Sequence, residues 1–494
     1  MLSKLATVAF QGINAADISV EVQIASGLPS FVIVGLPDKS IAESKERIRA
    51  SFSHLGLSLP SRRIIVNLAP SDLQKEGAHY DLPIALGILS ALQVLDASQL
   101  QEFLILGSLS LDAQLAPVAG VLPAVLRASA TQRGLICPSA NQNEALWAGE
   151  HLHLLAAPNL LSLVNHFKGT EPLLSTPLQA ESTTLSPPPA LGDMADVRGQ
   201  AILKRVFEIA AVGRHNVLML GPPGTGKSMM AQRMVSILPP LSPEESIETT
   251  MIYSLAGMLT EQGLVTQRPF RAPHHSASLV SLVGGGFRAK PGEISLAHNG
   301  VLFLDELPEF SRPTLEALRQ PLESNLVTIA RANQHVTYPA KIQLLAAMNP
   351  CRCGYYGQAG QECSRAPRCA IDYQAKISGP LLDRFDMRVY VQPVPVEDFL
   401  PNHHPVETSS SIRERVQSAL QFRTERPEES PETLSEATQT CLRQLTIQHN
   451  LSARGYTRLL SVARSIADLS RSESIQKEHL MEAIHYRLPM ANNG

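Results

Sequence analysis

The stretch Val217-Leu-Met-Leu-Gly-Pro-Pro-Gly-Thr-Gly-Lys-Ser228 decides the fold of this chain. Four apolar residues run directly into a glycine-rich loop, and the polar pair that follows can open a helix. The loop has the spacing G-x-x-x-x-G-K-[ST], in which glycines let backbone N–H groups surround phosphate oxygens. A chance glycine turn is the alternative, but here the strand, the loop and the polar helix start agree. The stretch therefore predicts an α/β nucleotide-binding core.

Each position of this loop has an expected role in binding ATP and Mg²⁺, the two predicted cofactors. Lys227 would reach the β- and γ-phosphates, and Ser228 would hold Mg²⁺. The residues expected to contact the nucleotide are Gly221, Pro222, Pro223, Gly224, Thr225, Gly226, Lys227 and Ser228.

Two further apolar strands end in polar side chains that suit the same site. Residues 301–304 run into Asp305 and Glu306. Asp305 would complete the Mg²⁺ shell, and Glu306 would polarise the attacking water. Asn349 follows a second apolar strand and can orient that water. Read alone, these features fit an acidic helix cap and an Asn-Pro turn, but the upstream loop favours the catalytic interpretation.

Composition limits the class of protein. A chain of 494 residues is too long for one core, so two or three domains are expected. Its net charge of −3 means that any nucleic-acid contact must depend on local basic charge. No apolar run reaches the ~18 residues of a membrane span, and the first residues lack a secretory signal. We therefore expect a cytoplasmic protein with no membrane partner.

The pattern changes along the chain divide it into four segments. We expect an α/β domain over 1–168, a Pro-, Ser- and Thr-rich linker over 169–192, an α/β ATPase core over 193–405 and a helical domain over 406–494. The expected strands are 20–24, 64–68, 217–220, 301–304 and 342–347, and the expected helices are 41–53, 199–213 and 227–237.

Several strings outside the glycine loop carry a family resemblance. They are Pro269-Phe-Arg-Ala-Pro-His-His275, Lys290-Pro-Gly-Glu-Ile-Ser-Leu-Ala-His-Asn-Gly300, Leu304-Asp-Glu-Leu-Pro-Glu-Phe310 and Gly27-Leu-Pro-Ser-Phe-Val-Ile-Val-Gly-Leu-Pro-Asp38. Together they resemble the YifB/ComM family of magnesium-chelatase-like AAA+ ATPases. The resemblance implies a hexameric DNA helicase that promotes branch migration during natural transformation. Its implied partners are single-stranded and branched DNA, further copies of the chain and recombination proteins.

The resemblance also assigns roles to three residues. Asn349 resembles the sensor-1 asparagine, and Arg454 resembles the sensor-2 arginine of a C-terminal helical lid. Arg384, in Ser378-Gly-Pro-Leu-Leu-Asp-Arg384, resembles the arginine finger that acts on the nucleotide of a neighbouring subunit. A surface ion pair is the alternative for Arg384, and whether Arg454 acts on its own or a neighbouring nucleotide stays open.

Residues 1–168 resemble the Lon-protease-type domain, a ribosomal-S5-like α/β fold. Aligning the motifs places Ile84 at the serine and Leu122 at the lysine that such proteases need. Neither side chain can act as a nucleophile or a base. We therefore expect a non-proteolytic platform for DNA or for ring assembly.

Four cysteines fall within nineteen residues and suggest a structural zinc site, since thiolates in a tetrahedral set bind Zn²⁺. They are Cys351, Cys353, Cys363 and Cys369. Their spacing departs from paired C-x₂-C motifs, so four surface thiols in a long loop remain the alternative. Cys137 and Cys441 fit ordinary packed thiols.

A DNA motor needs loops that line its pore. Residues 327–331 and 335–338 fit two strands of a hairpin, and 270–293 fits a helix-2 insert. Basic and aromatic side chains there suit backbone contact and base stacking, although a solvated tip is equally compatible with them. The candidate DNA contacts are Arg271, Phe287, Arg288, Lys290, Arg331, Asn333 and Gln334.

One rival function uses the same motor. A magnesium-chelatase- or MoxR-like remodeller would act on a protein partner instead of DNA. The Lon-like domain argues against a metal-chelatase motor, and Ile84 and Leu122 disfavour an ATP-dependent protease.

Overall fold

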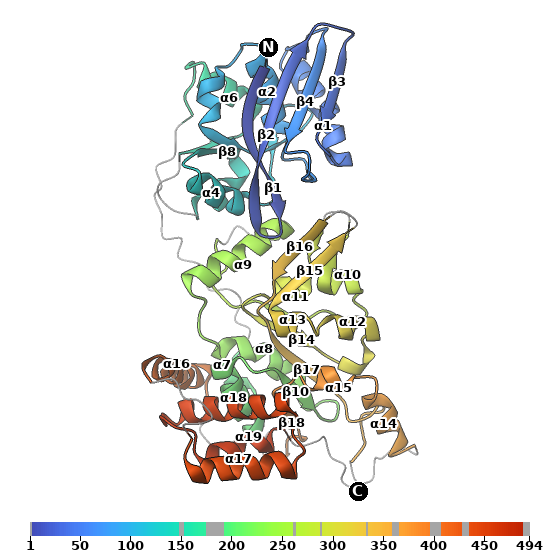
Figure 1. Cartoon of the computed structure of the whole chain (residues 1–494), viewed down its shortest axis with the longest axis vertical. Coiled ribbons are helices and arrows are strands. Elements are labelled where there is room, and N and C mark those ends of the chain that lie inside the picture. The colour runs from blue at the N-terminus through green and yellow to red at the C-terminus, as the bar shows by residue number, and fades with distance from the viewer. Residues whose placement is uncertain are drawn as a thin grey trace.

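The computed structural model shows a mixed α/β chain built around two separate sheets (Figure 1). One sheet lies near the N-terminus, the second lies in the middle of the molecule, and a group of helices from the C-terminal part packs beyond it. The structure describes residues 2–147, 153–173, 192–259, 263–286, 289–331, 334–357, 365–395, 407–426 and 434–487.

The N-terminal sheet has seven strands in the order β3-β4-β2-β1-β5-β8-β9. The expected strands 20–24 and 64–68 are confirmed within β2 and β4, whereas β1 was not anticipated. Alternate residues of β4 are buried, as in a sheet with one face on the core. The strands are β1 (Leu2–Gln11), β2 (Asn14–Ala25), β3 (Ser30–Val34), β4 (Arg63–Ala69), β5 (Phe103–Ile105), β8 (Gly134–Pro138) and β9 (Leu154–Ala157).

The helices of this part include α1 (Lys39–His54), α2 (Asp81–Ala91) and α4 (Val121–Ala130). The expected helix 41–53 is confirmed as α1, whose first turn is capped by the carboxylate of Asp38. Ile84 in α2 and Leu122 in α4 are fully buried in the apolar core. The two positions aligned with the serine and the lysine of Lon-type proteases are therefore occupied by apolar side chains that pack in the core.

The central sheet is entirely parallel, with the order β11-β14-β17-β10-β18. Its strands are β10 (Val217–Leu220), β11 (Phe270–Arg271), β14 (Val301–Leu304), β17 (Gln343–Met348) and β18 (Met387–Tyr390). Every residue of β10, β14 and β17 is buried, because apolar layers cover both faces. The carboxyl ends of these strands therefore meet at one edge of the sheet, where ligands of such folds bind.

Helices and a hairpin surround the central sheet. The expected helices 199–213 and 227–237 are confirmed as α7 (Ala201–Gly213) and α8 (Lys227–Ile237). The expected hairpin is confirmed as β15 (Leu326–Arg331) and β16 (Gln334–Pro339), which pair antiparallel with Arg331 opposite Gln334. Helix α9 (Pro243–Ala256) contacts the short strand β13 (Lys290–Pro291), which pairs antiparallel with β12 (Gly284–Gly285).

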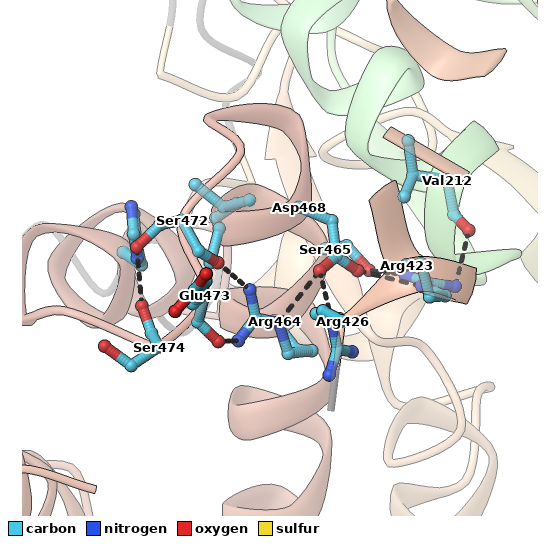
Figure 2. Close-up of polar contacts among 12 residues, drawn as sticks. Val212, Arg423, Arg426, Arg464, Ser465, Asp468, Ser472, Glu473 and Ser474 are labelled. Atoms are coloured by element: carbon cyan, nitrogen blue, oxygen red, sulfur yellow. Dashed lines mark hydrogen bonds and ion pairs between the residues drawn. The ribbon is translucent and has the colours of Figure 1, made fainter. Parts of the chain in front are cut away.

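The C-terminal part is helical, as expected. It contains α16 (Ser409–Glu425), α17 (Glu436–Gln448), α18 (Ala453–Leu469) and α19 (Lys477–His485). Figure 2 shows three arginines around the fully buried carboxylate of Asp468. Arg423, Arg426 and Arg464 donate to it at 2.8, 2.9 and 3.0 Å. Arg423 also donates to the Val212 carbonyl at 3.0 Å, which links this helical group to α7.

Helix α9 joins the central part to the N-terminal part through a hydroxyl group. The Ser254 hydroxyl accepts from the Gly120 backbone N–H at 3.1 Å and donates to the Glu144 carboxylate. Burial raises the pKa of Glu144, and hydrogen bonds from Ser254 and Leu122 oppose that shift. A cavity of about 270 Å³ lies beside this contact, and Phe10, His79, Lys290 and Tyr338 are among its lining residues.

Among the described residues, no helix is both long and apolar enough to cross a membrane.

Candidate nucleotide site

The glycine loop lies between β10 and α8, at the carboxyl edge of the central sheet. Gly224 and Gly226 adopt positive φ angles of 79° and 84°, which side chains with a Cβ rarely adopt. Gly226 is the N-cap of α8, so the backbone N–H groups of the first turn face the loop. The Thr225 hydroxyl donates to the Pro222 carbonyl at 3.0 Å and closes the loop from within.

Lys227 lies inside the loop with its ammonium group held by carbonyl oxygens. Its Nζ donates to the carbonyls of Gly221 and Pro222, each at 2.7 Å, and lies 3.4 Å from Oδ1 of Asn349. Burial lowers the pKa of Lys227 to about 8, against an opposing effect of Asp305. The ammonium group is thus placed where a phosphate oxygen could replace the carbonyls.

The two predicted Mg²⁺ ligands lie in direct contact. Ser228 Oγ donates to Oδ2 of Asp305 at 2.5 Å. Ser228 is the second residue of α8, and Asp305 directly follows β14, the second strand away from β10. An alcohol oxygen and a carboxylate at the end of a phosphate loop suit a hard cation such as Mg²⁺.

Glu306 has a partner that the sequence did not indicate. Its Oε2 lies 3.2 Å from Nδ1 of His275, and its backbone is left-handed with φ of 50°. His275 follows the edge strand β11, so it reaches the same edge of the sheet as Glu306. No role at the nucleotide was predicted for His274 or His275 from the sequence. The position of His275 four residues after an edge strand was the available signal.

Two arginines with predicted roles at the nucleotide meet at one oxygen atom. Nη2 of Arg384 lies 2.5 Å from Oε1 of Glu323, and Nη2 of Arg454 lies 2.8 Å from the same atom. Arg384 is 3% exposed and also donates to the carbonyls of Pro380 at 2.5 Å and Arg319 at 3.3 Å. In this conformation Arg384 is therefore bound within its own chain, while Arg454 is exposed.

Three of the four clustered cysteines converge. The sulfur atoms of Cys351, Cys353 and Cys369 all lie within 4.8 Å of one another, a set that can hold a metal ion. Cys363 lies outside the described residues. Cys137 and Cys441 are buried thiols elsewhere in the chain.

The candidate DNA contacts are only partly described. Arg271 forms a two-pronged pair with Glu293, at 2.7 and 2.8 Å. Lys290 is exposed on β13. Arg331 and Gln334 lie at the facing ends of the hairpin strands. Phe287, Arg288 and Asn333 lie outside the described residues.

Comparisons with protein families place this site in context. Residues 20–141 match the model for subunit ChlI of Mg-chelatase, residues 193–399 match that for magnesium chelatase, subunit ChlI, and residues 406–487 match that for the ChlI C-terminal part. These matches support a mixed α/β ATPase of the AAA+ type that uses ATP and Mg²⁺.

Two similar proteins match this chain over nearly its whole length, and a third matches part of it. Competence protein ComM of Haemophilus influenzae is 43% identical over 97% of this chain and 96% of its own length. The YifB protein of Escherichia coli is 42% identical over 98% and 97%, respectively. The DNA helicase MCM8 of Bos taurus is 26% identical over 42% of this chain and 22% of its own length. The chain therefore belongs to the YifB/ComM family of magnesium-chelatase-like AAA+ ATPases.

Proposed function

We propose that this chain is an ATP-driven DNA helicase that works as a hexameric ring and promotes branch migration while single-stranded DNA is integrated in natural transformation and recombination. The observation that carries the proposal is the assembled nucleotide site. Lys227, Ser228 and Asp305 converge at one sheet edge, and Asn349 lies beside Lys227. Such a site supplies phosphate binding, a metal position and water orientation for hydrolysis.

The DNA substrate is supported by two relatives and by the hairpin. One full-length relative is called a competence protein, and a distant relative of the central part is called a DNA helicase. The β15–β16 hairpin projects from the central part toward the N-terminal part (Figure 1). We propose that its tip, with the 270–293 insert, contacts single-stranded DNA through Arg271, Phe287, Arg288, Lys290, Arg331, Asn333 and Gln334.

The ring is proposed from the need for a second subunit at each nucleotide. Arg384 and Arg454 lie together at Glu323, so both can enter a neighbouring subunit's site only after leaving that carboxylate. We further propose that residues 1–168 form a non-proteolytic Lon-like platform, that 169–192 is a linker, and that 406–494 is the lid of the 193–405 core. Recombination proteins are proposed as partners, and zinc is proposed at the cysteine cluster.

The decisive experiment measures ATP hydrolysis with no DNA, with single-stranded DNA and with a three- or four-way junction, alongside displacement of a labelled junction strand. We expect stimulation by DNA and strand displacement. Lys227→Ala is the control, because it removes the phosphate-binding ammonium group. Basal hydrolysis without stimulation or displacement would contradict the DNA substrate and favour a remodeller of a protein partner.

A further inference from the structure

The cysteine cluster begins two residues beyond the nucleotide site. Asn349 ends the sheet edge beside Lys227, and Cys351 follows with its side chain fully buried. Its sulfur lies 3.0 Å from that of Cys353. The third sulfur comes from Cys369 in α14 (Arg368–Gln374), so two separate pieces of chain supply the set.

The spacing of these sulfurs fits one small ion. A tetrahedral Zn²⁺ with sulfur at about 2.3 Å holds its ligand atoms roughly 3.8 Å apart. The three sulfurs, within 4.8 Å of one another, need only small side-chain rotations to reach that geometry. Soft thiolate ligands select zinc over the hard Mg²⁺ of the nucleotide site. The fourth position of such an ion is open to another donor.

The turn that carries two of the cysteines touches the glycine loop directly. Gly354 has φ of 92°, and a Cβ at this position would lie 2.7 Å from Cδ of Pro223. The Gly354 N–H donates to the Cys351 carbonyl at 3.0 Å, which closes the turn around the thiols. From α14, Gln374 Nε2 donates to the Pro350 carbonyl at 2.9 Å. The cluster is therefore packed between the sheet edge and the loop that binds phosphate.

We propose that Cys351, Cys353 and Cys369 bind a structural zinc ion that positions the nucleotide site for hydrolysis. The ion ties α14 to the turn at 351–354, and this turn supports Pro223 on one side and Asn349 on the other. This inference rests on the proposed ATPase activity. Without the ion, the thiols no longer link the turn to α14. Among the described hydrogen bonds, the one from Gln374 to the Pro350 carbonyl then remains to hold α14 beside the turn. Asn349 and the loop then lose their fixed separation, while the loop's own glycines still bind phosphate.

The first arm of the test measures zinc. Purified full-length protein is denatured with its thiols blocked by a mercurial, and released zinc is read with a chelating dye. We expect about one zinc per chain in the unmodified protein. Cys353→Ser and Cys369→Ser should lose most of it, and Cys441→Ser, a buried thiol elsewhere, should keep it. A zinc-free unmodified protein with normal DNA-stimulated hydrolysis would overturn this inference and leave the proposed function intact.

The second arm separates positioning from simple structural support. Gly354→Ala keeps every thiol but pushes a methyl group against Pro223, whereas Gly357→Ala has the same kind of positive φ and no atom within 4 Å of its Cβ. We expect Gly354→Ala to keep zinc and ATP affinity while kcat falls about 10- to 100-fold. Gly357→Ala should stay within about 2-fold. Equal kcat values in these two variants would overturn the positioning role.

Discussion

Nδ1 of His275 and Oε2 of Glu306 lie 3.2 Å apart at the carboxyl edge of the central sheet. The His275 ring also lies beside the ring of His274, tilted by 35° with centroids 4.0 Å apart, and its edge faces Phe310. The pair places an imidazole ring beside the carboxylate that we expect to polarise water. His275 belongs to the 270–293 insert that we propose to contact DNA, so this pair joins the insert to the candidate nucleotide site.

Exchanging these side chains should separate ATP binding from hydrolysis. Glu306→Gln should bind ATP normally but lower kcat by about 10²- to 10⁴-fold, because the amide cannot take up a proton. His275→Ala should change kcat by more than 3-fold with little change in ATP affinity. His274→Ala is the matched control, since its Nδ1 contacts Ser276 and not Glu306. Stopped-flow nucleotide binding and steady-state hydrolysis measure the two quantities. Normal turnover in Glu306→Gln would remove its assigned role.

ATP affinity should depend on pH through Lys227. The pKa of Lys227 is lowered to about 8 by burial, so its ammonium group is charged below pH 8 and loses its proton above it. We expect the Kd for ATP to rise up to about 10-fold between pH 7 and pH 9. Lys227→Ala should bind ATP poorly at every pH, with no such slope. Calorimetric titration at four pH values measures this, and a flat wild-type profile would contradict it.

Arg384 should be needed in trans although it is bound to Glu323 here. Arg384→Ala should retain ATP binding and lose most hydrolysis, because a finger stabilises charge in the neighbouring site. Mixing it with Lys227→Ala subunits should restore part of the activity, since some interfaces then combine an intact loop with an intact finger. Failure of every mixing ratio would exclude action in trans.

Glu323 offers a second test of the same arginines. Glu323→Gln keeps the volume of the side chain but removes the charge that holds both guanidinium groups. We expect hydrolysis to appear at lower protein concentration. In this variant Arg384 and Arg454 need not break their ion pairs with Glu323 before they reach the phosphate bound by the neighbouring subunit. Glu316→Gln is the control, since the ion pair of Glu316 is formed with Arg319, at 2.8 Å. An unchanged concentration dependence would show that this ion pair does not limit assembly.

The parts of the fold that the sequence predicted are those set by local patterns. Strands β10 and β14 are continuous apolar runs, and β17 is apolar after Gln343, because both faces of a parallel sheet are covered. Polar residues, Asp305 and Asn349, directly follow β14 and β17. The glycine loop has a fixed spacing because only certain positions need positive φ. The residues of the candidate nucleotide site could therefore be proposed from the chain alone.

The parts that were missed depend on tertiary contacts. Strand β1 was not expected, since its burial follows the alternating pattern only in part. Glu323 lies in a short helix, and no local motif shows that Arg384 and Arg454 meet there. The same holds for Ser254, whose bond to Glu144 joins side chains 110 positions apart. Such pairs are created by packing and carry no periodic signal.

The buried carboxylate of Asp468 should be essential for the stability of the helical part. Asp468→Asn leaves Arg423, Arg426 and Arg464 without a counter-charge (Figure 2). We expect a loss of about 3–5 kcal/mol in the free energy of unfolding. Asp372→Asn is the control, because its pair with Arg368 is exposed and 4.0 Å long, and it should cost less than about 1 kcal/mol. Denaturant unfolding of both variants measures the difference.

Stability should also fall in mild acid because of His215. This ring is buried, its Nε2 lies 2.8 Å from Ser465 Oγ, and burial lowers its pKa to about 4. The unfolded chain binds a proton at this residue near pH 6.5, so it gains protons before the folded chain does. The contribution of His215 to the free energy of unfolding is therefore constant above about pH 7 and decreases as the pH falls toward 4.

We expect His215 to account for roughly 2 kcal/mol of the stability lost between pH 7 and pH 5. His215→Gln should have a flatter profile over that range, whatever its absolute stability, because glutamine does not titrate. His54→Gln, at an exposed position, should keep the wild-type slope. Denaturant midpoints at pH 7, 6 and 5 give the three profiles. Parallel wild-type and His215→Gln profiles would mean that this ring takes up its proton before the chain unfolds.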